Sequence, residues 1–148
     1  YQAGLIGVKV FAEGKGLNAE TAWTNKAAAM NFSSPIVVGQ HLYGLGPAKN
    51  LVCVEIASGR VAWSKDGYFN TAPGSAHAAF LGMGKNILVC TDAGQLVLIA
   101  ANPTACRELG RTQVCGFNWC NPAYADGRLY VRDGLKSTGN LFCVDLLP

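Results

Sequence analysis

Residues 35–44 have the sequence PIVVGQHLYG, in which a glycine separates two short apolar runs. Related stretches stand at residues 81–90 (LGMGKNILVC) and 122–131 (PAYADGRLYV). Their aligned glycines are 45 and 43 residues apart: Gly39, Gly84 and Gly127. A glycine between two β-rich runs is typical of a tight hairpin turn. A repeat of this length, built from short strands, predicts an all-β repeat array.

Each repeat contains enough short β-rich runs for a sheet of four antiparallel strands. In the first complete repeat these runs lie at residues 34–38, 41–45, 51–56 and 60–65, with small turn residues between them. Four strands in a meander form one blade of a β-propeller. We therefore predict a single all-β segment, a propeller arc of about three and a half blades. Its expected parts are a partial blade at 1–32, blades at 33–78 and 79–120, and a blade lacking its outer strand at 121–148.

An open arc of blades exposes apolar faces and unpaired strand edges at its two ends. Propellers avoid this by closing into rings of roughly four to eight blades. We expect the arc to belong to a ring of about seven or eight blades. Two arrangements satisfy that expectation: these residues are the C-terminal blades of a longer propeller, or two arcs combine into one ring.

The most specific motif is CVEIASGRVAW at residues 53–63. Cys53 is small enough to let neighbouring blades approach closely, and Glu55 can hydrogen-bond the backbone of the following turn. Gly59 supplies the positive φ of a hairpin. We expect the ring of Trp63 to lie flat between neighbouring blades and to bury a large apolar area.

Partial copies of this motif occur elsewhere in the chain. Trp23 stands 40 residues before Trp63, and the run FCVDL around Cys143 repeats the run around Cys53. In the second complete blade the position of the tryptophan falls near residues 109–110, a leucine and a glycine. The contact between blades is therefore expected to be weaker there.

This motif, with its acidic residue, Ser-Gly-Arg and tryptophan, resembles the tryptophan-docking repeat of PQQ-like β-propellers. That group includes the BamB-type outer-membrane assembly lipoproteins. The resemblance covers nearly the whole chain and points to the C-terminal blades of exported bacterial proteins, through residues 23–26, 32–35, 51–53, 94–98 and 127–133. It implies a periplasmic or otherwise exported scaffold that is not catalytic and uses no cofactor. The implied partners are another protein or the remaining blades of the same propeller, in a multi-subunit assembly.

The same resemblance includes an alternative, a quinoprotein-like oxidoreductase that uses PQQ and Ca²⁺. Such an enzyme is expected to have a tryptophan beneath the quinone, an adjacent pair of cysteines, and carboxylate and amide oxygens that bind Ca²⁺. The chain has no Cys-Cys pair and no cluster of Asp, Glu and Asn with that spacing. The site of such an enzyme would lie mainly in other blades, so we assign no catalytic, cofactor-binding or metal-binding residue.

On a rigid repeat fold, function usually resides in the loops. The candidate interaction loops are residues 69–77 and 116–122, which carry polar and aromatic side chains between predicted strands and could present them to a protein or glycan. The candidate residues are Asn70, Thr71, His77, Phe117 and Trp119. Two other readings of Trp119 stay open: it faces the central channel, or it packs against the next blade.

Charge and hydropathy argue against two classes of partner. The chain has 12 Lys and Arg against 9 Asp and Glu, a net charge of +3 with no basic run, so nucleic-acid binding is not expected. No apolar run approaches the ~20 residues of a membrane helix. The two histidines, His41 and His77, stand at no metal-ligand spacing from a cysteine or carboxylate.

The six cysteines fall into two groups. Three lie in apolar runs and are expected to be buried free thiols between blades: Cys53, Cys90 and Cys143. Cys115 and Cys120 flank a short bend and are a candidate disulfide in an oxidising compartment. Cys106 is the competing partner of Cys115.

Overall fold

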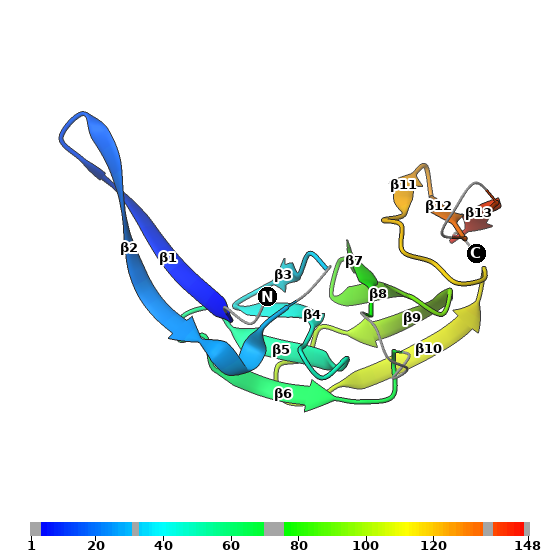
Figure 1. Ribbon diagram of the computed structural model, residues 1–148, viewed down its shortest axis with the longest axis horizontal. Coiled ribbons are helices and arrows are strands. Elements are labelled where there is room, and N and C mark those ends of the chain that lie inside the picture. Colours follow the sequence, from blue (N-terminus) through cyan, green and yellow to red (C-terminus); the bar gives the residue numbers. More distant parts are fainter. Residues whose placement is uncertain (1–3, 31–32, 70–75, 135–137, 147–148) are drawn as a thin grey trace.

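The computed structural model describes residues 4–30, 33–69, 76–134 and 138–146 of the 148-residue chain. These residues form four antiparallel sheets that follow one another along the chain and stand side by side in an arc (Figure 1). Apart from one 3-10 turn, η1 (Lys26–Ala28), every regular element in the described ranges is a strand. The predicted all-β class is therefore confirmed.

The sheets are built from strands that pair in chain order. The first sheet holds β1 (Leu5–Glu13) and β2 (Gly16–Asn25). The second sheet holds β3 (Ile36–Val38), β4 (His41–Leu45), β5 (Leu51–Glu55) and β6 (Val61–Lys65). The third sheet holds β7 (Ala78–Met83), β8 (Asn86–Thr91), β9 (Gln95–Ala100) and β10 (Arg107–Gln113). The last sheet holds β11 (Ala123–Ala125), β12 (Arg128–Arg132) and β13 (Leu141–Asp145).

Because every sheet is an antiparallel meander, its connections alternate between two ends. The turns between first and second strands, and between third and fourth strands, lie at one end. The segments that enter a first strand, and those that join a second strand to a third, lie at the opposite end, which we call the loop end. In the described residues the loop end consists of 33–35, 46–50, 66–69, 76–77, 92–94, 114–122, 133–134 and 138–140.

In each of the last three sheets, the turn between the first and second strands has backbone in the left-handed region. The leading residues of these turns are Gly39, Gly84 and Asp126, with φ of 61°, 64° and 49°. The sequence alignment puts Gly127 in this position, but the structure puts Asp126 there and Gly127 one place later. Aspartate tolerates the left-handed region better than most residues, so the turn forms without a leading glycine.

The outer strand pairs of the first three sheets share one irregularity. In each, the register breaks directly after one residue pair: Gly7 with Trp23, Cys53 with Trp63, and Leu98 with Gly110. The extra residues on the outer strands are Ala22, Ala62 and Leu109. A bulge of this kind bends the strand and increases its local twist. The shared bulge aligns the three outer strands, so Gly110 stands where the other two carry a tryptophan.

Apolar side chains fill the spaces between successive sheets. One cluster between the first and second sheets includes Leu5 and Val54, one between the second and third includes Tyr43 and Val89, and one between the third and last includes Leu88 and Leu129. Face-to-face packing of successive sheets is the arrangement predicted for the blades of a propeller arc.

The structure corrects three details of the sequence interpretation. In the partial blade, the sequence pattern predicts a strand that ends at residue 6 and a new one that begins at residue 7, but Leu5 and Ile6 belong to β1 together with the residues that follow. Ala78, expected to end the first complete blade, begins β7 in the third sheet. Cys143 is exposed and not buried, because the face of the last sheet that carries it is covered by no sheet in the described residues.

Candidate functional site

Trp23 bridges the first two sheets. Its indole Nε1 donates a hydrogen bond of 2.8 Å to the carbonyl oxygen of Ile56, in the turn after β5. The ring lies against two glycines, one on its own sheet and one on the next: a Cβ atom at Gly7 or at Gly59 would overlap it. The two glycines therefore allow the indole to lie flat between the sheets.

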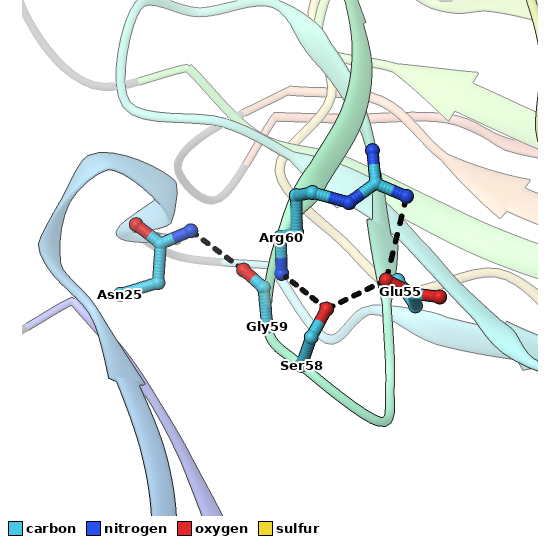
Figure 2. Close-up of polar contacts among 5 residues, drawn as sticks. All are labelled: Asn25, Glu55, Ser58, Gly59 and Arg60. Atoms are coloured by element: carbon cyan, nitrogen blue, oxygen red, sulfur yellow. Dashed lines mark hydrogen bonds and ion pairs between the residues drawn. The ribbon is translucent and has the colours of Figure 1, made fainter.

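Polar contacts hold the turn between β5 and β6 in shape (Figure 2). Ser58 Oγ donates to Glu55 Oε2 at 2.6 Å and accepts from the Arg60 backbone N–H at 3.2 Å. Arg60 Nη2 lies 3.4 Å from the same carboxylate oxygen, and Asn25 on the first sheet donates to the Gly59 carbonyl at 2.6 Å. The Ser58 hydrogen bond and, to a smaller extent, Arg60 lower the pKa of Glu55. These contacts fix the shape of the turn to which Trp23 and Asn25 of the first sheet bind.

Trp63 makes the corresponding contact one sheet later. Its Nε1 donates a hydrogen bond of 2.8 Å to the carbonyl oxygen of Asn102, in the turn after β9. Its ring centroid lies 6.0 Å from that of Tyr43, with 55° between the planes. Cys53, its partner in the register, is completely buried, and burial raises the pKa of the Cys53 thiol. Both tryptophans therefore connect one sheet to the outer turn of the next.

The two predicted interaction loops meet at the loop end. His77 directly precedes β7, and Trp119 lies between β10 and β11, yet their rings stack with centroids 6.3 Å apart and 29° between the planes. Phe117 lies 6.2 Å from Trp119, centroid to centroid. His77 is buried, whereas Phe117 and Trp119 are 41% and 36% exposed. We call His77, Phe117 and Trp119 the aromatic cluster.

Asn118 fixes the backbone between the two exposed rings. Its side chain is buried, and its backbone N–H donates to the Asp92 carbonyl at 2.9 Å. Its Nδ2 lies 3.1 Å from Cys90 Sγ, and its Oδ1 accepts from the Cys120 N–H at 2.6 Å. Because both ends of the amide have partners, Asn118 anchors the segment that presents Trp119.

Asp133 ties this segment to the last sheet. Its carboxylate accepts from the Asn140 N–H at 2.7 Å and from the Gly116 N–H at 3.1 Å. These hydrogen bonds lower the pKa of Asp133, and that from Asn140 is the largest cause. In addition, the Phe117 carbonyl accepts from the Gly134 N–H at 2.8 Å.

The buried side of the aromatic cluster contains neutral groups. Burial lowers the pKa of His77, and the smaller opposing effect of Asp92 does not restore it. Burial raises the pKa of Cys90 to about 12, and the neighbouring Cys115 adds to the increase. His77 is therefore neutral and Cys90 is a protonated thiol at pH 7, so neither is activated as a nucleophile.

The remaining loop candidates, Asn70 and Thr71, lie outside the described residues. The candidate disulfide is not formed in the structure, where all six cysteines are free. Cys115 Sγ lies 3.9 Å from the Gly94 carbonyl, whereas Cys120 Sγ lies 4.0 Å from Arg132 Nη1. The two thiols are directed at different groups, and the competing Cys106 is also free.

Sequence reasoning missed Asn118, Asp92 and Asp133. A signal for two of them was present, since Asp92 and Asp133 each directly follow the second strand of their sheet. Within the described ranges, no group of three or more His, Cys, Asp or Glu could hold a metal ion. No helix found there has the length and apolar character needed to cross a membrane.

Comparison with known proteins bears on the fold. No family model and no curated protein matches the sequence. Among solved structures, the chain is similar to BamB from Moraxella catarrhalis, with a TM-score of 0.64 and 14% identity over 97% of this chain. The fold is a β-propeller arc. The chain spans 47% of the length of that BamB chain, and at this identity the likeness concerns the fold alone.

Proposed function

We propose that the chain is part of a non-catalytic, PQQ-like β-propeller scaffold whose loop end binds a protein partner. The observation that carries this proposal is the aromatic cluster, in which Phe117 and Trp119 stay partly exposed although the backbone between them is anchored. Aromatic side chains held in this way are common anchors of protein interfaces. Because their backbone is already ordered, binding loses little conformational entropy.

We further propose that this scaffold works in an exported, periplasmic compartment of a bacterium and belongs to a multi-subunit assembly. The support is the resemblance of the repeat motif to PQQ-like propellers and the likeness of the fold to BamB. Three of the six free thiols, those of Cys53, Cys90 and Cys115, are buried and so shielded from oxidation, whereas that of Cys143 is exposed. Cell fractionation of the full-length protein tests the location.

Site-specific crosslinking tests the interaction face. A photoreactive residue at Phe117 should crosslink one defined protein in cells, and the same residue at Tyr124, also exposed but on β11, should not. With that partner purified, Trp119→Ala should weaken binding roughly tenfold or more, as for an interface hot spot. Equal crosslinking at both positions, or unchanged affinity of Trp119→Ala, would overturn the proposal.

No observation on the described residues favours the quinoprotein alternative. We propose that the scaffold acts without a cofactor, which a direct assay can test. Adding PQQ and Ca²⁺ to the purified full-length protein should give neither a protein-bound quinone absorption band nor dye-linked oxidation of alcohols. A saturable band with turnover would show that the protein is an enzyme.

A further inference from the structure

The interface between the third and last sheets contains a cavity at the position of an absent tryptophan side chain. The shared bulge places Gly110 of β10 in register with Trp23 of β2 and Trp63 of β6. A Cβ atom at Gly110 would meet nothing within 4 Å. Gly110 therefore faces open space where the other two interfaces are filled by an aromatic ring.

That space is a cavity of about 310 Å³. One wall comes from the third sheet: it is mainly apolar, with Leu88 of β8 and Leu98 of β9, and also contains Gly110, Arg111 and Thr112 of β10. Val144, Asp145 and Leu146, at the end of the last sheet, line the cavity from the other side. An apolar cavity of about 150 Å³ is known to bind a benzene ring, so this one is large enough for a bicyclic aromatic ring.

The facing wall also contains the backbone segment that accepts the indole N–H in the other interfaces. The N–H of Leu146 donates to the Gly127 carbonyl at 2.9 Å. The backbone N–H of Ile56 makes the same contact, and the Ile56 carbonyl accepts the indole N–H of Trp23. The backbone N–H of Ala101 makes it too, and the carbonyl of the next residue accepts the indole N–H of Trp63. Leu146 is therefore the structural counterpart of the docking turns, and it lines the cavity.

We propose that this cavity is a binding site for an indole-type ring: a planar aromatic group with one N–H donor. The ring would lie over Gly110, between Leu98 and Val144, with its N–H directed at the backbone near Leu146. The ring can be supplied by a free small molecule or by a tryptophan side chain in an extended peptide. In the other two interfaces the rings of Trp23 and Trp63 lie between the sheets, each with its N–H donated to a backbone carbonyl.

The first experiment uses free indole and the unmodified protein. We expect saturable changes in methyl NMR signals, confined to Leu98, Val144 and their neighbours, with a Kd of about 1 mM or tighter. N-methylindole has the same ring without the N–H donor and should bind severalfold more weakly. A tripeptide with a central tryptophan, titrated in parallel, shows whether free ring or side chain is the better source. Non-saturating shifts for both ligands, or shifts elsewhere in the protein, would overturn the proposal.

The second experiment fills the cavity with a side chain of the protein itself. Gly110→Trp should raise the unfolding midpoint and weaken indole binding at least tenfold. Gly16→Trp is a matched control, because a Cβ atom there would meet only the Glu13 carbonyl oxygen, at 3.9 Å, and Gly16 does not line the cavity beside Gly110. That variant should retain the affinity of the unmodified protein for indole. Full indole binding by a folded Gly110→Trp protein would contradict the proposal; if this variant does not fold, the methyl signals of the unmodified protein decide.

Discussion

At the scale of single residues, the interface between the first two sheets depends on the missing side chains of two glycines as much as on the tryptophan ring that packs against them. Trp23 fits because neither Gly7 nor Gly59 has a side chain, and its N–H is satisfied by a backbone carbonyl. Gly59 also adopts a φ of 70°, so it meets a backbone requirement and a packing requirement together. Gly59 thus determines both the shape of its turn and the packing of Trp23 against it.

A pair of glycine variants separates these two requirements. Gly59→Ala should lower the free energy of unfolding by more than about 2 kcal/mol, since the strain of positive φ alone costs roughly 1–2 kcal/mol. Gly14→Ala has similar backbone strain, with a φ of 61°, but its Cβ atom would meet nothing within 4 Å. Urea unfolding of both variants measures the difference. Equal losses would mean that Trp23 does not lie against Gly59.

Removing the second tryptophan tests the next interface. Trp63→Ala should lower the free energy of unfolding by about 3 kcal/mol, the lower end for large aromatic residues, because Trp63 is only partly buried. Tyr124→Ala is the control, an exposed aromatic residue whose loss should change stability by less than about 1 kcal/mol. Urea denaturation followed by circular dichroism gives both values, and comparable small effects would show that Trp63 makes no stabilising contact.

His77 should make stability depend on pH. Burial lowers its pKa, so between the folded and unfolded values the unfolded chain binds more protons. Its contribution is fully present above the ordinary histidine pKa of about 6.5 and declines as pH falls toward the lower folded value. His77→Phe should reduce this decline, and His41→Gln should retain it. Urea midpoints at several pH values between 5 and 8 measure the effect; an unchanged slope in His77→Phe would be the contrary result.

How far the sequence predicts these residues depends on how local the signal is. Gly59 and the tryptophans lie in a motif of fixed spacing, so their contacts follow from the repeat. The stacking of His77 on Trp119 joins residues 42 positions apart, and no spacing rule connects them. The exposure of Cys143 was not predictable from its apolar strand either, because burial depends on whether a further sheet covers that face.

At the scale of elements, the β1–β2 hairpin differs from its counterparts. Trp23 stands 16 positions after its partner Gly7, whereas Trp63 stands only 10 positions after Cys53, and Figure 1 shows the longer hairpin projecting from the arc. One face carries the ion pair of Lys9 with its cross-strand partner on β2. The opposite face carries apolar side chains that are more than half exposed: Val8, Val10 and Leu17. The strand repeat predicted a hairpin here but not its extra length.

This apolar face should promote self-association. The double variant Val10→Thr/Leu17→Thr keeps strand-forming residues and should reduce light scattering at high protein concentration. Its unfolding midpoint should change by less than the equivalent of about 0.5 kcal/mol per site. Lys9→Thr/Glu20→Thr on the polar face is the control and should not reduce scattering. Unchanged scattering in the first variant would show that the exposed face is not adhesive.

At the scale of the whole molecule, successive sheets pack face to face, the outer turns of the second and third sheets each receive a tryptophan, and Leu146 of the last sheet lines the cavity beside Gly110. The period of the repeat was enough to predict this architecture, because stacked β-sheets are the usual way to bury both faces of such units. The closed ring of about seven or eight blades stays a prediction. The outer faces of the first and last sheets have no neighbouring sheet in the described residues.

The most direct test of side-by-side stacking is a proton NMR measurement of nuclear Overhauser effects from the tryptophan rings. We expect cross-peaks between the Trp23 ring and the α protons of Gly59, and between the Trp63 indole N–H and protons around Asn102. Trp23 should give no cross-peak to the third sheet. Loss of the first two contacts in a folded protein, or a cross-peak from Trp23 to residues 78–113, would contradict the order of the sheets.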